Sequence, residues 1–270
     1  MSDRRFQSVA WSVPFPIGSK HKSKLDLIAR PICLYCSCHL STSHERERSM
    51  LSATDRTQIK KAARKAVHDV EQLHRIIDES LIAHIAISDA SGPIVIPMLA
   101  WRADNQVYIH GARNSRLIKA LRSGQNTCLT FTLFDGWVLA RSAFHHSAHY
   151  RSAVVFGQFN VIEENAEKDR LLNHFIEQIA PGRTEQVRLS NEKELNATEL
   201  LVIGLEEASV KISAFGVNDD SSDLDRPVWA GILPYRTVVG PLVGVEEQQG
   251  SIAQPDYSHA YGTRWHQASR

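Results

Sequence analysis

The sequence predicts a mainly β (α+β) fold, a closed antiparallel β-barrel with peripheral helices. Short apolar runs bounded by turn residues recur between Leu81 and Phe215, as is typical of antiparallel strands. Only a few amphipathic helices interrupt these runs, and strands and helices do not alternate regularly, which argues against a doubly wound parallel sheet. With 270 residues, 43% of them hydrophobic, the chain is long enough to bury a large core.

The chain divides into four expected parts. Residues 1–49 are rich in serine and basic residues and lack periodicity, so we expect a disordered or dispensable tail, with Met50 as an alternative start. Residues 50–68 are expected to be a basic helical lead-in with a solvated face. The folded domain is expected over 69–242, and 243–270 reads as a polar C-terminal tail.

The first elements of the domain have clear signals. Apolar residues at helical spacing follow Asp69, a suitable N-cap, so a helix is expected over 69–80. The apolar runs 81–88 and 94–101 flank the turn-rich segment 89–93 and predict a hairpin.

The later elements follow from the same kinds of signal. They are a strand over 107–110; a helix capped by Asn114 or Ser115 and ended by Gly124; a hairpin of 127–133 and 137–141 around Asp135-Gly136; a strand over 152–162; a helix around 171–179 ended by Pro181-Gly182; and a strand pair or one bent strand over 200–215.

Composition narrows the function. The formal net charge of +1 provides no global field that would attract nucleic acid or an acidic membrane. No apolar run approaches the roughly 18 residues that a membrane helix needs, and the chain's start lacks the apolar core of a secretory signal. Unpaired cysteines favour a reducing compartment, so a cytoplasmic location is expected, with organellar targeting by 1–49 left open.

The three cysteines Cys33, Cys36 and Cys38 form a C-x-x-C-x-C cluster. A structural zinc site needs a fourth ligand, for which His39 is the candidate, and normally a second paired knuckle. Only one knuckle is visible, so no metal site is expected.

A phosphate-binding corner is predicted at 110–116. A strand is expected to end at His110, and Gly111 allows a close turn of the backbone. A helix then begins, with Arg113, Ser115 and Arg116 at its N-terminus. Backbone N–H groups at a helix start, two guanidiniums and a hydroxyl suit a phosphate. An ordinary capped helix with solvated arginines is the alternative.

The segment 141–152 concentrates ring systems and hydrogen-bond donors between two apolar runs, including His145, His146 and His149. If the segment is extended, His145 and His146 point to opposite faces and do not share a zinc ion; a helical turn would let His145 and His149 meet. A serine hydrolase would need a G-x-S-x-G elbow, which is absent. We therefore predict one wall of a pocket for a flat aromatic anion.

Several segments together resemble a known family. They include Tyr108-Ile-His-Gly111, Ser115-Arg116, the run from Leu139 to Ser147, and the run from Tyr150 to Gly157. Over residues 66–242 the chain resembles the pyridoxamine 5′-phosphate oxidase-related flavoproteins, in the branch that includes the nitroimidazole-resistance proteins. The resemblance implies a split β-barrel that binds FMN at a homodimer interface.

The resemblance also implies which residues contact the flavin. Ser115 and Arg116 would hold the phosphate, the strand 95–99 would run beside the ring, and His110 and Gly111 would lie under the ribityl chain. The residues expected to bind the cofactor are Val95, Ile96, Pro97, Met98, His110, Gly111, Arg113, Ser115, Arg116, Phe144, His145, His146, Tyr150, Arg151 and Ser152.

Two departures from the family shape the expected function. Leu117 replaces a basic phosphate contact, for which Arg113 or Lys119 could substitute. The substrate-binding block of the oxidases that make pyridoxal phosphate is missing from 241–270, so pyridoxamine phosphate is not the expected substrate.

We expect an FMN-dependent oxidoreductase that reduces a small aromatic, nitro or quinone-like compound, with His145 or His146 as proton donor. Two alternatives stay open: a non-catalytic flavin-binding protein, and a haem-binding split barrel in which a histidine ligates iron.

Overall fold

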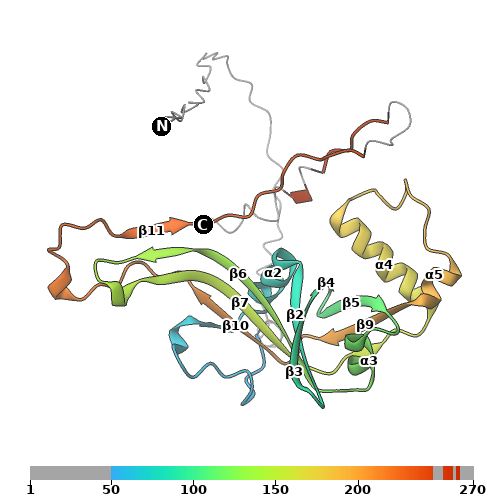
Figure 1. Ribbon diagram of the computed structural model, residues 1–270, viewed down its shortest axis with the longest axis horizontal. Helices are drawn as coiled ribbons and strands as arrows, with labels where there is room; N and C mark the ends of the chain where they lie inside the picture. The colour runs from blue at the N-terminus through green and yellow to red at the C-terminus, as the bar shows by residue number, and fades with distance from the viewer. Residues whose placement is uncertain (1–49, 246–251, 258–259, 262–270) are drawn as a thin grey trace, which may run out of the picture. The chain divides into compact units, whose positions relative to one another are not determined.

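The strands pair into two antiparallel sheets (Figure 1). The computed structural model describes residues 50–245, 252–257 and 260–261, all of which belong to one compact unit, Ser41–Arg270. Within these residues the larger sheet has seven strands in the order β1-β10-β7-β6-β2-β3, with β11 on β6, and the smaller has four in the order β4-β5-β9-β8. The predicted tail 1–49, its cysteines and most of 246–270 lie outside the described residues.

The elements have the following bounds: η1 (Ala63–Lys65), β1 (Ala66–Val67), α2 (Val70–Ser80), β2 (Ile82–Asp89), β3 (Gly92–Leu99), β4 (Trp101–Ala103), β5 (Gln106–Ala112), α3 (Arg116–Arg122), β6 (Thr127–Leu139), η2 (Ala143–His145), β7 (Ser147–Gly157), β8 (Asn160–Val161), α4 (Asn165–Ile179), α5 (Glu192–Ala197), β9 (Thr198–Gly204), β10 (Ala208–Ser213), η3 (Ser221–Asp223) and β11 (Gly231–Pro234).

The main core lies between the two sheets and α2. Asp69 caps α2 by accepting a hydrogen bond from the Glu71 N–H, as the sequence predicted. The apolar stripe of this helix, Leu73, Ile76 and Ile77, is fully buried against strands of both sheets. Each such side chain contributes about 1.5–3 kcal/mol by leaving water. A second, smaller cluster packs α4 against the outer face of the four-stranded sheet.

The sheets do not close into one barrel, so the split antiparallel barrel with peripheral helices is confirmed and the fully closed barrel is wrong. The predicted helix 69–80, the hairpin of β2 and β3, strand β5 and helices α3 and α4 are all present. Their ends lie within about two residues of the expected ones, except that α4 starts at Asn165, six residues before the expected start at 171. None of the described helices is long and apolar enough to cross a membrane.

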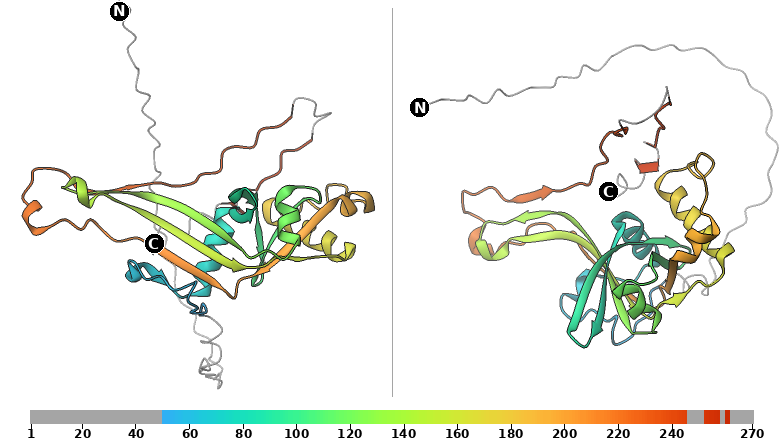
Figure 2. Two further views of the ribbon diagram at one scale, coloured as in Figure 1. Left: turned by 60° about the horizontal axis from the view of Figure 1, so that its bottom comes forward. Right: turned by 45° about the vertical axis from the view of Figure 1, so that its right-hand side comes forward.

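The hairpin predicted around Asp135-Gly136 is wrong. Residues 127–139 form one long strand, β6, whose pairing with β7 shifts register between Phe134 and Gly136 in a β-bulge. The chain turns back only after Ala140, so β6 and β7 form a long arm that projects from the body of the domain (Figures 1 and 2). Gly136 serves the bulge because it takes φ +150° and lies under the backbone of β11.

The lead-in 50–68 is not helical as expected. It consists of turns followed by the three-residue 3-10 helix η1 and the short strand β1. Its basic residues follow no apolar period, so an α-helix would bury nothing there. Instead Thr57 is buried, and its hydroxyl donates to the Ser52 carbonyl at 3.0 Å.

We predict that Gly136→Ala lowers the free energy of unfolding by about 1–3 kcal/mol. An added Cβ would meet the Leu233 carbonyl oxygen at 2.6 Å, and the backbone conformation disfavours an L side chain. Urea denaturation measures the change. Gly240→Ala, where no atom lies within 4 Å of the new Cβ, is the control and is expected to be neutral. Equal stability of the two variants would contradict the bulge assignment.

Candidate functional site

The predicted phosphate corner lies between the β2–β3 turn and the start of α3. Ser115 caps α3, since its hydroxyl accepts a hydrogen bond from the Ile118 N–H at 3.2 Å. Arg116 donates through Nε to Asp89 Oδ2 at 2.9 Å and through a terminal nitrogen to the Ser91 hydroxyl at 3.0 Å. Hydrogen bonds from Ser91 and Arg116 lower the pKa of Asp89 to about 2, so Asp89 is ionised at neutral pH.

Helix α3 has only seven residues, so its dipole adds little to this corner. The guanidinium of Arg116 is therefore the main group that the corner offers to an anion. Its side chain is 56% exposed, which leaves it accessible beside Asp89.

Arg113 belongs to a second ionic cluster. Its Nε lies 3.0 Å from Glu199 Oε2, and Arg122 reaches the same oxygen at 2.8 Å. Glu199 is fully buried. Its hydrogen bond with Arg113 raises the pKa of the Arg113 guanidinium. The cluster carries a net positive charge, because two arginines share one carboxylate.

Strand β3 forms an edge of the larger sheet. Within the described residues it pairs only with β2, so the peptide groups on its outer side have no strand partner. Val95 and Pro97 are exposed, whereas Ile96 and Met98 pack on the core. The prolines Pro93 and Pro97 fit an edge position, where a missing N–H costs no ladder bond.

Gly111 and His110 face opposite sides of β5. A Cβ on Gly111 would lie 3.1 Å from Ile118 and 3.8 Å from Met98, so this residue faces α3 and β3. His110 instead packs beside Trp101 and Phe175 on the α4 side, where burial lowers the pKa of its imidazole. Gly111 therefore lies toward the Arg116 corner, and the side chain of His110 points away from it.

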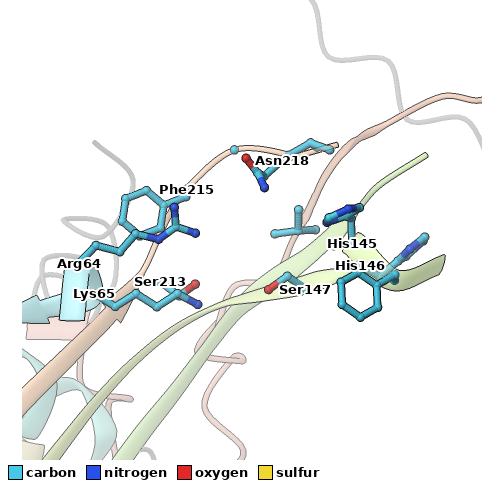
Figure 3. A pocket seen from close by; sticks show the side chains of 12 residues that line it. Arg64, Lys65, His145, His146, Ser147, Ser213, Phe215 and Asn218 are labelled. Atoms are coloured by element: carbon cyan, nitrogen blue, oxygen red, sulfur yellow. The ribbon is translucent and has the colours of Figure 1, made fainter. Parts of the chain in front are cut away.

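The first residues of the predicted wall 144–152 line a separate pocket. Phe144, His145 and His146 lie at the turn of the β6–β7 arm and line a pocket of about 440 Å³ (Figure 3). The opposite side of this pocket comes from Arg64 and Lys65 of η1. Ser213 at the end of β10 and residues 215–218 after it line the pocket as well.

An extended segment, the condition under which His145 and His146 would point to opposite faces, is not what the structure has. Residues 143–145 form the 3-10 helix η2, and both residues line the same pocket. His149 does not join them; its Nε2 lies 2.7 Å from the Phe215 carbonyl oxygen. Within the described part of the chain, no group of three or more histidine, cysteine or acidic side chains is placed to hold a metal ion.

Arg151 is held by carboxylates. Its guanidinium donates to both Asp135 oxygens, at 2.7 and 2.8 Å, and to both Glu79 oxygens. Burial would lower the pKa of Arg151, but the bonds to Asp135 and Glu79 outweigh it and raise that pKa. This network joins the bulge of β6 to the end of α2.

The side chains of Tyr150 and Ser152 also make contacts within the chain. The Tyr150 ring lies under the Lys65 ammonium, 5.3 Å from the ring centroid. The Ser152 hydroxyl donates to the Lys211 carbonyl at 3.4 Å.

The two predicted ends of the flavin site are apart within one chain. The turn of the β6–β7 arm lies at one end of the domain and α3 at the other, in each view (Figures 1 and 2). The Arg116 corner, Gly111 and the edge of β3 do come together, because Asp89, Ser91 and Met98 link them.

The sequence did not identify Arg64, Lys65, Ser213 or residues 215–218 as pocket residues. The basic stretch was visible in the sequence, but its proximity to the histidines depends on the pairing of β1 with β10 and of β10 with β7. No local pattern encodes those pairings.

Comparisons with known proteins show the family. The profile of the family described as Pyridoxamine 5′-phosphate oxidase matches residues 69–212. A search of curated proteins found no match.

Two solved structures cover most of the domain. The flavocytochrome Anf3 from Azotobacter vinelandii is 33% identical with a TM-score of 0.73, over 76% of this chain and 96% of that one. The FAD and haem binding protein from Mycobacterium smegmatis is 30% identical with a TM-score of 0.69, over 73% and 97%. A 5-nitroimidazole antibiotic resistance protein from Bacteroides thetaiotaomicron is 21% identical with a TM-score of 0.46. The match covers 54% of this chain and 86% of that one.

We predict that Arg151→Met lowers the free energy of unfolding by about 3 kcal/mol, because it leaves two partly buried carboxylates without their cation. The Arg151 side chain is only 16% exposed. Arg170→Met, which breaks the pair with Glu167 at a side chain 64% exposed, is the control and is expected to cost less than about 1 kcal/mol. Chemical denaturation of both variants measures this, and similar losses would show that the Arg151 network is not structural.

Proposed function

Because the chain belongs to the pyridoxamine 5′-phosphate oxidase family, which has a flavin-binding fold, we propose that it is a redox protein that binds a flavin and a haem. The observation that carries this proposal is the match to a flavocytochrome and to a FAD and haem binding protein over 96% and 97% of their lengths. A flavin exchanges electrons in pairs or singly and a haem iron singly, so the two together can pass electrons from a two-electron donor to a one-electron acceptor.

The edge of β3 and the Arg116 corner are the flavin site that we propose. The outer peptide groups of Val95–Met98 would offer donors and acceptors to the polar edge of the ring. Gly111 leaves room between β3 and α3, since its absent side chain would press on Ile118. Arg116 would bind a phosphate oxygen beside the Ser115 cap.

FMN was the cofactor that the sequence predicted, and FAD fits this corner better. A terminal phosphate monoester carries about −1.5 to −2 charges at pH 7. Arg116 is already paired with Asp89, and Leu117, which replaces the basic residue, is buried. Each phosphate of a pyrophosphate diester carries only one negative charge, so a phosphate of this kind beside Arg116 needs less positive charge at that one place than a monoester does, and we propose FAD.

We also propose that the protein is a homodimer. The arm carries an exposed aromatic cluster in which the Phe134 ring contacts Trp137 at 4.9 Å and Tyr235 at 5.0 Å between centroids. These three side chains are 40–50% exposed. Contiguous apolar patches of this kind mark interaction sites, and a second copy would bring the arm of one chain toward the β3 edge of the other.

Electron transfer to a small aromatic, nitro or quinone-like acceptor is the reaction class that we propose, as the sequence predicted. His145 ends η2 and His146 follows it, at the turn of the β6–β7 arm, and in Figure 1 the end of this arm lies away from α3, which begins at Arg116. Any proton donation by them to a flavin would therefore act across the dimer.

We predict that Arg116→Ala weakens flavin binding by about 10- to 100-fold, the cost of losing one or two charge-assisted hydrogen bonds to a phosphate. Arg170→Ala, on the exposed face of α4, is the matched control and is expected to bind flavin normally. Fluorescence titration of apoprotein with FAD and FMN measures both variants. Wild-type preference for FMN over FAD would contradict the FAD assignment, and unchanged binding by Arg116→Ala would contradict the site.

We predict a sedimentation mass of twice the 30.3 kDa of one chain. Trp137→Glu in the exposed aromatic cluster is expected to shift the protein toward monomer, because a buried unpaired carboxylate opposes the interface. Val243→Glu, at a side chain 91% exposed outside the arm, is the control. A wild-type monomer at micromolar concentration would contradict the dimer.

A further inference from the structure

The pocket at the turn of the β6–β7 arm is lined mainly by polar side chains. Arg64, Lys65 and Ser213 lie on one side of it, and Figure 3 shows all three away from the His146 ring. The volume of about 440 Å³ lies within the range of small-molecule sites. A polar lining of this kind suits a hydrophilic ligand.

Two cations at this pocket have no counter-ion among the described residues. The Arg64 Cζ lies 4.9 Å from the Phe215 ring centroid, and the Lys65 ammonium lies 5.3 Å from the Tyr150 ring centroid. Neither cation forms an ion pair with a carboxylate in the described part of the chain. A contact with a ring holds a cation in place without neutralising it, so both charges stay available to an anion.

The acidic residues next to the pocket are already paired. None of the described residues that line the pocket is acidic. Asp219 and Asp220 follow the lining residue Asn218 in sequence. However, Asp219 Oδ2 lies 2.8 Å from the Arg141 guanidinium, and Asp220 Oδ2 lies 3.1 Å from His145 Nε2. The charge that the lining presents is therefore positive.

The Ser213 hydroxyl is the group that most directly indicates a ligand. Ser213 is only 4% exposed and lines the pocket. Its hydroxyl has no hydrogen-bond partner among the described residues, whereas buried polar groups nearly always have one. The oxygen is not among the fully enclosed side-chain atoms, so the small surface that it keeps opens on the pocket.

Strand pairing places this hydroxyl near the two cations. Ser213 of β10 is paired directly with Tyr150 of β7, so the two side chains project from the same face of the sheet. The Lys65 ammonium lies over the Tyr150 ring, and the Arg64 guanidinium lies over Phe215, two residues after Ser213. A hydroxyl, an ammonium and a guanidinium therefore face one part of the pocket.

From this donor set we propose that the pocket binds the phosphate group of a small, hydroxyl-rich phosphate monoester, a sugar phosphate. A phosphate monoester carries about −1.5 to −2 charges at pH 7, which two cations match, and its oxygens accept hydrogen bonds from a guanidinium and a hydroxyl. Ser147 and Asn218 also line the pocket, and their side chains have no hydrogen-bond partner in the described residues. They would bind hydroxyl groups of the sugar. This site is separate from the Arg116 corner and does not depend on a flavin or a haem.

The test is a calorimetric titration of the full-length protein with ribose 5-phosphate, with ribose and with inorganic phosphate. FAD is present in excess, so that the probes do not enter the proposed flavin site at Arg116. Ribose 5-phosphate is expected to bind, inorganic phosphate is expected to bind more weakly, and ribose is expected to give no heat of binding.

Three variants locate the site. The double variant Arg64→Gln, Lys65→Gln is expected to weaken the binding of ribose 5-phosphate about 10- to 100-fold, because charge-assisted hydrogen bonds are lost. Ser213→Ala is expected to weaken this binding about 2- to 10-fold without lowering the free energy of unfolding, since the hydroxyl has no partner within the described chain. Lys61→Gln removes a charge from the same basic segment at an exposed residue outside the pocket, and is the matched control with unchanged binding expected.

Four results would overturn the assignment. The first is a wild-type protein that does not bind ribose 5-phosphate, which would leave the proposed flavin and haem binding untouched. The second is equal weakening by Lys61→Gln and by the double variant, which would reduce the effect to the charge of the segment. The third is loss of binding in Arg116→Ala with Arg64, Lys65 and Ser213 intact, which would place the phosphate at the flavin corner. The fourth is equally tight binding of inorganic phosphate, which would remove the sugar from the proposal.

Discussion

The junction between the β6–β7 arm and the rest of the domain is the constraint on which the sites depend. At this junction Arg151 of β7 binds Asp135 of the bulge and Glu79 at the end of α2. Gly136 in the same bulge lets β11 lie on the outer edge of β6. The bulge, the partly buried Arg151 and the added strand together fix the arm where it leaves the body. The pocket at its turn and the aromatic cluster on its face both exist because the arm is held there.

This geometry separates the segments 110–116 and 144–152, which the sequence analysis assigned to one flavin site. The Arg116 corner belongs to the body of the domain, where β3 has an open edge and Gly111 leaves space beside α3. The arm turn belongs to a pocket that η1 completes.

Local signals predicted the parts of the fold that depend on local interactions. Asp69 and Ser115 cap the helices as expected, because a cap acts within three residues. Asp135-Gly136 misled because the same pair suits a tight turn and a bulge, and only the distant strand β11 decides between them. Arg151 was predicted to contact a ligand, but its partner Glu79 comes from another element far along the chain. The Ser115 cap could be predicted because its partner is three residues away, whereas the contacts of Arg116 with Asp89 and Ser91 and the position of Arg64 beside the same pocket as the arm depend on distant segments.

The absorption spectrum of the purified full-length protein, recorded before and after reduction, is the most direct test of bound redox groups. We predict flavin bands and a Soret band together in the oxidised protein, with bleaching of the flavin bands and a shift of the Soret band on reduction. A spectrum with neither chromophore, in protein that also takes up none when flavin and haem are supplied, would contradict the central claim that this split barrel is a redox protein.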